Sequence, residues 1–346
     1  MKLDTQLGHR GLSAAADEAE SYERMGFDGA WTFEAGHDPF LPVALAARAT
    51  TRMALGTNIA VAFARSPMSM AQAAWDLQKL SGGRFHLGLG TQVRAHVERR
   101  YSMPYDPPVP RLVDYVRCLR AIWDNFQTGA KPSYEGRFYR FTLMNPMFSG
   151  GRIEHPRIPI WIAGVNPLIC HAAGEVADGF HVHPLHTVSY LRELVIPAIE
   201  EGAARAGRQR SDVQLYSPIF AATGETQADR DRSIEEVRRQ ISFYGSTPTY
   251  RPVLEHLGHG DVARQLSDLA RRGEWAAMAK LVPDDVVEAV GVIEKPSALP
   301  KAIRERYAGV LDRVSLYFPI RAEDSEGAWQ AFAKAFRDDG ADGPPA

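Results

Sequence analysis

The chain has 346 residues, of which 45% are hydrophobic and 24% are charged. These are ordinary globular values, and they exclude a disordered chain, a collagen-like fibre and a disulfide scaffold as descriptions of the whole protein. The 40 basic residues nearly balance the 42 acidic ones, for a formal net charge of -2. The chain therefore lacks the concentrated basic field that a nucleic acid or an anionic membrane would attract.

The sequence also predicts the cellular compartment of the protein. No apolar run approaches the ~20 residues of a membrane span, and residues 158–165 form one of the longest. The first residues lack the apolar stretch of a signal peptide. The two cysteines, Cys118 and Cys170, lie in helix-like apolar patterns, which is typical of buried thiols in a cytosolic protein. We therefore expect a cytoplasmic protein.

Short apolar runs that end in Gly, Asn or His alternate along the chain with segments of helical period. Strands are predicted at residues 2–7, 29–34, 53–61, 84–90, 158–163, 179–183, 213–223 and 314–320. Helices are predicted between them: Gly26 ends the first, Asp38-Pro39 and Ser66-Pro67 begin the next two, and others cover 112–126 and 329–336. This alternation predicts an α/β fold of the (β/α)8 TIM-barrel class with a parallel sheet.

Two longer segments interrupt the alternation. Residues 128–159, which are rich in Pro and Gly and contain a hairpin-like stretch at 134–139, follow the fourth strand, and residues 243–294 follow the seventh. We interpret both as insertions, of the kind that forms lids over barrel mouths, in a single domain of residues 1–337. Residues 338–346 are rich in Gly, Asp and Pro and predict a disordered tail.

A (β/α)8 barrel carries its active site on the loops that follow the strands, so these loops hold the candidate residues. After the fifth strand, Ala163-Gly-Val-Asn-Pro167 places a glycine just before a helix that begins with proline. The exposed amides and partial positive charge of such a helix start suit a phosphate, although an ordinary βα turn has the same pattern.

Gly88 and Gly90 resemble part of a dinucleotide fingerprint. The third glycine is missing, because Val93 occupies its place, and both glycines lie in or at the end of a strand. A Rossmann fold is therefore not indicated. Glycines at a strand end instead favour the close approach of a flat ligand to the backbone.

Histidines at two places in the sequence could take part in a reaction or bind a metal. His37, in Glu34-Ala-Gly-His-Asp38 after the second strand, could exchange a proton with a substrate, whereas Asp38 is more simply a helix cap. His181-x-His183-x-x-His186 could bind a divalent metal, as in a metal-dependent barrel hydrolase. No second group of ligands has suitable spacing, so we expect no metal site and favour a substrate-facing or structural role for these histidines.

Taken together, several segments resemble the bacterial luciferase-like superfamily in order and spacing. They lie at residues 26–31, 55–57, 65–67, 81–90, 134–139 and 177–179, and the resemblance covers nearly the whole chain. In detail the chain looks most like the coenzyme F420-dependent oxidoreductases of that superfamily. The resemblance implies a TIM barrel with flavin-like rings in its mouth, and a homodimer.

The resemblance also implies site residues. Relatives carry a non-prolyl cis peptide at the end of the third strand, which matches Asn58–Ile59, followed here by Ala60. The turn that contacts the rings matches Thr91 and Gln92, with Arg94 nearby. The phosphate-binding turn matches Ala163, Gly164, Val165 and Asn166. The arginines that could face the acidic tail of the cofactor are Arg65, Arg94, Arg99 and Arg100.

Our main hypothesis is an oxidoreductase that passes a hydride between C5 of F420 and a small organic substrate. His37 is the first candidate for the proton donor and His183 the second, with Glu34 in the same catalytic group. Many relatives place a histidine directly after the strand-two acid, whereas two residues separate Glu34 from His37 here. The alternatives are a monooxygenase that uses reduced FMN, the metal-dependent hydrolase, and a non-catalytic barrel that senses a flavin-like ligand.

Overall fold

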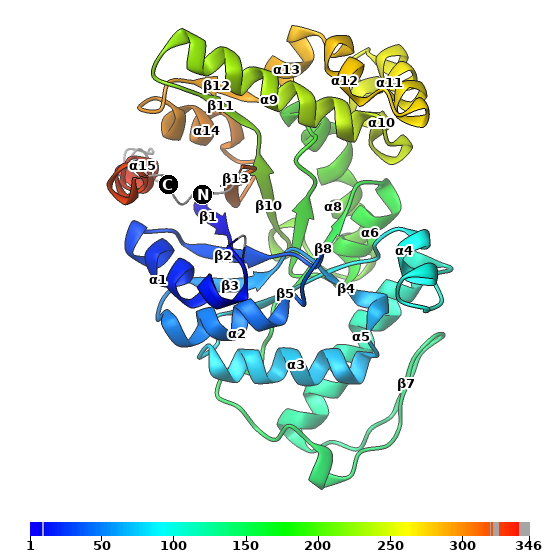
Figure 1. Ribbon diagram of the computed structural model, residues 1–346. Helices are drawn as coiled ribbons and strands as arrows, with labels where there is room; N and C mark the ends of the chain where they lie inside the picture. The colour runs from blue at the N-terminus through cyan, green and yellow to red at the C-terminus, as the bar shows by residue number, and fades with distance from the viewer. Residues whose placement is uncertain (9, 319, 321–324, 339–346) are drawn as a thin grey trace. The chain divides into compact units, whose positions relative to one another are not determined.

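A sheet of nine strands runs through the chain in the computed structural model, which describes residues 1–8, 10–318, 320 and 325–338 (Figure 1). Its strands are β1 (Lys2–Gln6), β2 (Gly29–Thr32), β3 (Ala54–Thr57), β4 (Ala60–Val61), β5 (Phe85–Gly90), β8 (Ile160–Gly164), β9 (Gly179–Val182), β10 (Gln214–Ile219) and β13 (Arg313–Leu316). Their order is β3-β2-β1-β13-β10-β9-β8-β5-β4, and β3 also pairs with β5, so the sheet closes on itself. Because β3 and β4 are two pieces of one predicted strand, the fold is the predicted eight-stranded α/β barrel.

The chain divides into two compact units. The first comprises residues 4–181 and 198–214, with helices α1 (Ala15–Met25), α2 (Phe40–Ala49), α3 (Pro67–Leu80), α4 (Arg94–Arg99), α5 (Pro108–Thr128), α6 (Pro167–Val176) and most of α8 (Ile196–Arg205). The second comprises residues 1–3, 182–197 and the described residues from 215 on. Its helices are α7 (Val188–Tyr190), α9 (Gln227–Gly245), α10 (Arg251–His256), α11 (Gly260–Arg272), α12 (Trp275–Met278), α13 (Asp284–Val290), α14 (Leu299–Tyr307) and α15 (Glu326–Asp338).

The helix ends follow the local chemistry of the sequence. Gly26 has the left-handed conformation, with a φ of 95°, and ends α1 as predicted. The Ser66 hydroxyl accepts from the Ser69 amide, with Pro67 as the first residue of α3. At α2 the prediction is wrong by one residue, because the helix begins at Phe40, whose amide donates to the Asp38 carboxylate at 2.8 Å.

Two predicted strands are not continuous. The third is interrupted at Asn58–Ile59, which is a cis peptide bond, as the resemblance implied. The seventh ends at Ile219, and β11 (Ala221–Thr223) pairs instead with β12 (Val292–Glu294) in a separate two-stranded sheet. The helices α9 to α13 lie between β11 and β12, so the second insertion begins earlier than residue 243 (Figure 1).

The first insertion contains the predicted hairpin. β6 (Tyr134–Glu135) pairs in antiparallel fashion with β7 (Arg140–Phe141). The Asp114 carboxylate of α5 accepts from the Phe138 and Tyr139 amides at 2.6 and 3.0 Å, which fixes the turn between these strands. At the other end of the chain, the helix predicted at 329–336 is α15. It extends to residue 338, and the rest of the predicted disordered tail, 339–346, lies outside the described residues.

Large aromatic side chains fill the inside of the sheet in the first unit. Trp31, Trp161 and His181 are buried and lie with ring centroids 5.0–5.4 Å apart. The Trp31 indole donates to Asp4 at 2.8 Å, and the Trp161 indole donates to His86 at 2.9 Å. Because side chains occupy this space, a ligand must lie at the strand ends.

Two other expectations concern the chain as a whole. Cys118 and Cys170 are free thiols, and both are buried, as predicted. No helix in the described part of the chain combines the length and the apolar character that crossing a membrane requires.

Candidate active site

The turns that the resemblance singled out lie at neighbouring strand ends of the first unit. β4 pairs with β5 through Ala60 opposite Leu89 and Val61 opposite Gly90. β5 pairs with β8 in the same direction, with Leu89 opposite Ile162. Because these strands are parallel, the turns that flank or follow them, at 58–61, 91–94 and 163–166, come together at one edge of the sheet.

Backbone hydrogen bonds hold the turn at 58–61 against β2. The Asn58 amide donates to the Thr32 carbonyl at 2.5 Å, and the Ile59 carbonyl accepts from the Glu34 amide at 3.1 Å. Asn58 and Ile59 are half-buried and Ala60 is buried. The apolar Ile59 side chain therefore has a fixed place at the strand ends, where part of it remains open to a ligand.

The glycines of β5 lie close to the chain itself. A Cβ at Gly88 would come within 1.7 Å of the Thr57 carbonyl oxygen, and one at Gly90 within 2.8 Å of the Ile59 side chain. The close approach at both glycines is to protein groups, and these contacts account for the absence of a side chain there. That a flat ligand lies against this stretch of backbone stays a prediction.

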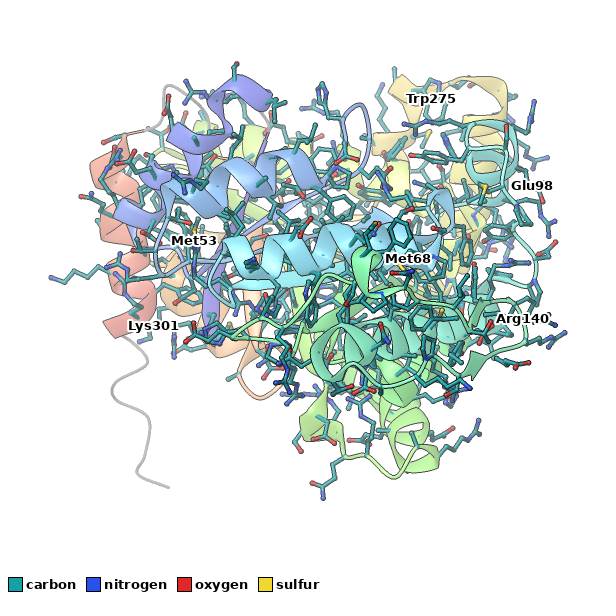
Figure 2. All side chains as sticks on the ribbon, turned by 90° about the horizontal axis from the view of Figure 1, so that it is seen from below. Met53, Met68, Glu98, Arg140, Trp275 and Lys301 are labelled. Carbon is teal, nitrogen blue, oxygen red and sulfur yellow. The ribbon has the colours of Figure 1, made fainter. Side chains whose placement is uncertain are left out.

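The turn after β5 holds Thr91 and Gln92, which are both half-buried. Gln92 has a φ of 56°, and its side-chain oxygen accepts from the Val93 amide at 2.9 Å. Arg94 forms ion pairs with Asp106 and, at 3.3 Å, with Glu98, an exposed residue on α4 (Figure 2). Its guanidinium is thus already neutralised by two carboxylates.

The turn after β8 fits the predicted anion site. Asn166 is the N-cap of the ten-residue helix α6, its side chain accepts from the Ile169 amide at 3.0 Å, and Pro167 is the first helical residue. Neither the Val165 nor the Asn166 amide donates to another described residue. Ala163, Gly164 and Val165 are half-buried, and a Cβ at Gly164 would overlap Ile169. Free amides at a helix start are suited to an anion.

Glu34 lies in a dense hydrogen-bond network. Its side chain is 6% exposed and accepts from the Val61 amide at 2.7 Å, from Arg65 at 2.8 and 3.0 Å, and from the Tyr101 hydroxyl at 3.1 Å. Arg65 also pairs with Asp38 at 2.7 Å. Glu34 therefore joins the loop after β2 to the turn after β4, and Arg65 is not free to face a cofactor tail.

Unlike Glu34, His37 has a side chain without a hydrogen-bond partner among the described residues. It is exposed and makes no hydrogen bond to another described residue. It lines a pocket of about 110 Å³ together with residues of β2, α2 and the segment after β1. A histidine with free ring nitrogens beside a pocket can exchange a proton with a bound molecule.

His183, in the second unit, has a more enclosed environment. Its ring stacks on Tyr250, with centroids 4.0 Å apart, and meets the edge of Tyr244 at 4.4 Å. Its Nδ1 accepts from the Leu185 amide at 3.2 Å, which leaves Nε2 to carry the proton of the neutral ring. Burial, with a smaller effect of nearby His186, lowers the pKa of His183 to about 3. His183 is thus a neutral imidazole at physiological pH.

The other two histidines of the predicted triplet have structural surroundings. His181 packs between Trp31 and Trp161, and His186 Nε2 shares a hydrogen bond of 2.8 Å with the Ser217 hydroxyl. Among the described residues, no three His, Cys, Asp or Glu side chains converge in a way that could hold a metal ion.

His186 is expected to make the protein sensitive to acid. Burial, followed by the charge of Arg306, lowers its pKa from 6.5 to about 3. The unfolded chain takes up a proton at His186 near pH 6.5 and the folded chain does not, so the free energy of unfolding falls as the pH falls through this range. Between pH 6.5 and 5 the loss is about 2 kcal/mol.

Urea unfolding followed by tryptophan fluorescence measures this effect. His186→Asn is less stable at pH 7, because a packed ring is lost, but its free energy of unfolding changes less between pH 7 and 5 than that of the wild type. His155→Asn, at an exposed histidine, keeps the wild-type pH profile. Equal pH profiles for the wild type and His186→Asn would contradict the assignment.

The chain is similar to several known proteins. The family model described as luciferase-like monooxygenase matches residues 2–337. An uncharacterized protein of Mycobacterium tuberculosis is 45% identical over 337 residues, which cover 97% of this chain and 98% of that protein. The 5,10-methylenetetrahydromethanopterin reductase of Archaeoglobus fulgidus is 25% identical, over 86% of this chain and 87% of the reductase.

The fold recurs in solved structures. One is the structure of the coenzyme F420-dependent tetrahydromethanopterin reductase from Methanopyrus kandleri. It superposes with a TM-score of 0.78 at 21% sequence identity, and the match covers 97% of this chain and 98% of the reductase. This agreement confirms the predicted barrel class.

Proposed function

Because the chain belongs to the family of luciferase-like monooxygenases, we propose that it is an oxidoreductase that transfers a hydride between C5 of coenzyme F420 and a small organic substrate. The coenzyme F420-dependent reductase of Methanopyrus kandleri, which this chain matches over most of its length, supports a deazaflavin in place of FMN. Bound F420 would supply the two-electron chemistry, and the protein would supply binding, orientation and a proton.

The residues at the strand ends fit such a cofactor. The free amides of Val165 and Asn166 would hold its phosphate at the start of α6. Ile59 and the turn at Thr91 and Gln92, on the neighbouring strands, would face its planar rings. The two amides without partners at this end of the sheet are the observation that carries the proposal of a phosphate-bearing cofactor.

His37 would hold the proton that the substrate gains or loses. A carbonyl that takes up a hydride at carbon needs a proton at oxygen, and the reverse reaction returns that proton. Of the two histidines proposed for this role, His37 has free ring nitrogens, whereas Nδ1 of His183 is occupied.

Titration of F420 and FMN, separately, into the apoprotein tests the cofactor. We expect fluorescence or calorimetry to show binding of F420 and weak or absent binding of FMN. Asn166→Asp should raise the dissociation constant of F420 at least tenfold, because aspartate preserves the helix cap but adds a negative charge beside the phosphate.

Asn145→Asp is the matched control. Asn145 caps a short helical turn in the first insertion in the same way, accepting from the Met147 amide at 3.0 Å. This variant should bind F420 like the wild type. Tight FMN binding without a response to F420 would reverse the cofactor assignment, and unchanged F420 affinity in Asn166→Asp would remove the phosphate from this turn.

The second candidate is a monooxygenase that uses reduced FMN, which the description of the matching family favours. It would use the same anion site, since FMN also carries a phosphate. Oxygen consumption coupled to product formation would identify it, because hydride transfer from a deazaflavin does not need oxygen. A homodimer in the cytoplasm, acting on a small molecule, completes the proposal.

A further inference from the structure

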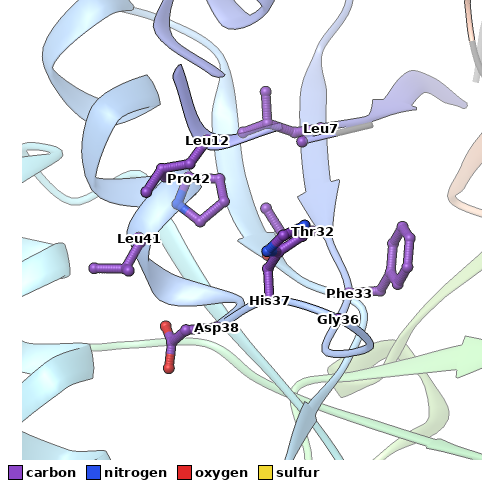
Figure 3. A pocket seen from close by; sticks show the side chains of 10 residues that line it. Leu7, Leu12, Thr32, Phe33, Gly36, His37, Asp38, Leu41 and Pro42 are labelled. Carbon is purple, nitrogen blue, oxygen red and sulfur yellow. The ribbon is translucent and has the colours of Figure 1, made fainter. Parts of the chain in front are cut away.

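The pocket beside His37 is built mainly from apolar side chains (Figure 3). Its volume is about 110 Å³, and its lining residues are Leu7, Gly8, Leu12, Thr32, Phe33, Gly36, His37, Asp38, Leu41 and Pro42. In Figure 3, Leu12, Leu41 and Pro42 form one side of it. At roughly 10–15 Å³ for each water-sized group, it has room for about seven to eleven non-hydrogen atoms.

The polar side chains that line the pocket already form hydrogen bonds within the protein, except for His37. The Thr32 hydroxyl donates to the Pro39 carbonyl at 2.7 Å. One Asp38 oxygen accepts from the Phe40 amide at 2.8 Å and the other from Arg65 at 2.7 Å. His37 is the lining side chain that keeps hydrogen-bonding atoms free of the described residues.

The charges around the pocket disfavour an anionic ligand. The described lining residues include no lysine or arginine, and the nearby Arg65 is paired with both Glu34 and Asp38. A carboxylate or phosphate placed here would meet the Asp38 carboxylate without a cationic side chain in the described lining to balance it.

The rim of the pocket leaves apolar surface uncovered. Leu12, Phe33 and Leu41 are 42%, 46% and 53% exposed. Glu18, which is buried, accepts from the Gly8 and Arg10 amides at 3.0 and 3.1 Å and so holds the segment after β1 that forms one side of the rim. An apolar rim beside one free polar group is typical of a small-molecule site.

We propose that this pocket binds the apolar part of a neutral substrate, a short alkyl or aryl group next to a carbonyl or carbinol carbon, with His37 hydrogen-bonded to the substrate oxygen. The inference rests on the proposed function for the reaction itself, and it adds the substrate class. Phosphorylated and carboxylated compounds are disfavoured in this pocket.

Methyl NMR of the apoprotein, labelled at leucine methyl groups, tests binding without the cofactor. We expect 2-hexanone to shift the Leu7 and Leu12 methyl signals, and hexanoate, of similar size but negatively charged, to bind at least tenfold more weakly. Leu41→Trp should abolish the 2-hexanone shifts by filling the pocket. Leu45→Trp, one helical turn further along α2 and 39% exposed, adds the same ring outside the lining and should keep them.

Turnover of 2-hexanone with reduced F420, which donates the hydride to the carbonyl carbon, then separates the two proposals. Leu41→Trp should raise the KM for 2-hexanone at least tenfold, with the F420 dissociation constant unchanged. If 2-hexanone shifts no pocket methyl in the wild type, or hexanoate binds equally well, the substrate class is wrong, whatever the cofactor. If 2-hexanone binds as expected but F420 does not, the proposed function fails and the pocket assignment stands.

Discussion

Glu34→Gln should lower the free energy of unfolding by about 3 kcal/mol, the size expected when one partner of a buried ion pair is removed. The carboxylate accepts four hydrogen bonds, from the Val61 amide, from one Arg65 nitrogen that reaches both oxygens, and from the Tyr101 hydroxyl, and it is only 6% exposed. Glutamine keeps one oxygen, so its NH2 group must face one of these donors, and Arg65 loses its most buried partner. Urea unfolding at pH 7 measures the change.

Asp38→Asn is the matched control, because Asp38 pairs with the same arginine. Its side chain is 38% exposed, so the loss should be at most about 1 kcal/mol. If Glu34→Gln keeps the wild-type stability but loses turnover, Glu34 is a catalytic residue, as the sequence suggested. The expected result assigns it a positioning role, because it ties the loop after β2 to the turn that carries Ile59.

His37→Asn should lower kcat by roughly 10²–10⁴-fold, the usual contribution of a positioned general acid or base. Asparagine can still hydrogen-bond a substrate oxygen but cannot supply a proton near neutral pH. Because His37 is exposed and makes no hydrogen bond to the described residues, the free energy of unfolding and the F420 dissociation constant should change little. Stopped-flow or steady-state oxidation of reduced F420 by 2-hexanone measures kcat.

His183→Asn distinguishes the two candidate donors. Burial lowers the pKa of His183 to about 3, so the ring is neutral at pH 7 and has no imidazolium proton to donate to a substrate. Its loss should reduce kcat less than tenfold and act mainly on stability, through the lost stacking on Tyr250. The reverse pattern, with His183→Asn inactive and His37→Asn active, would exchange the two roles. His155→Asn, at an exposed histidine outside the candidate site, is the control and should keep the wild-type kcat.

Local chemistry in the sequence was enough to predict the architecture. The alternation of strand and helix patterns predicted eight strand positions, and the Ser66-Pro67 cap and the proline at Pro167 marked helix starts that the structure confirms. These features depend on residues a few positions apart, whose backbone preferences are local. The resemblance added the cis bond at Asn58–Ile59, which no spacing rule predicts.

Only the tertiary structure decided which side chains are free to act. Glu34 and His37 are neighbours in one loop, yet the partners of Glu34 come from 27, 31 and 67 residues away, and those contacts leave His37 as the unengaged group. In the same way, burial among Tyr244 and Tyr250 makes His183 neutral, and two stretches of the chain, 7–12 and 32–42, contribute to the pocket. Burial and hydrogen bonding depend on contacts between segments distant along the chain, and such contacts leave no period or motif in the local sequence.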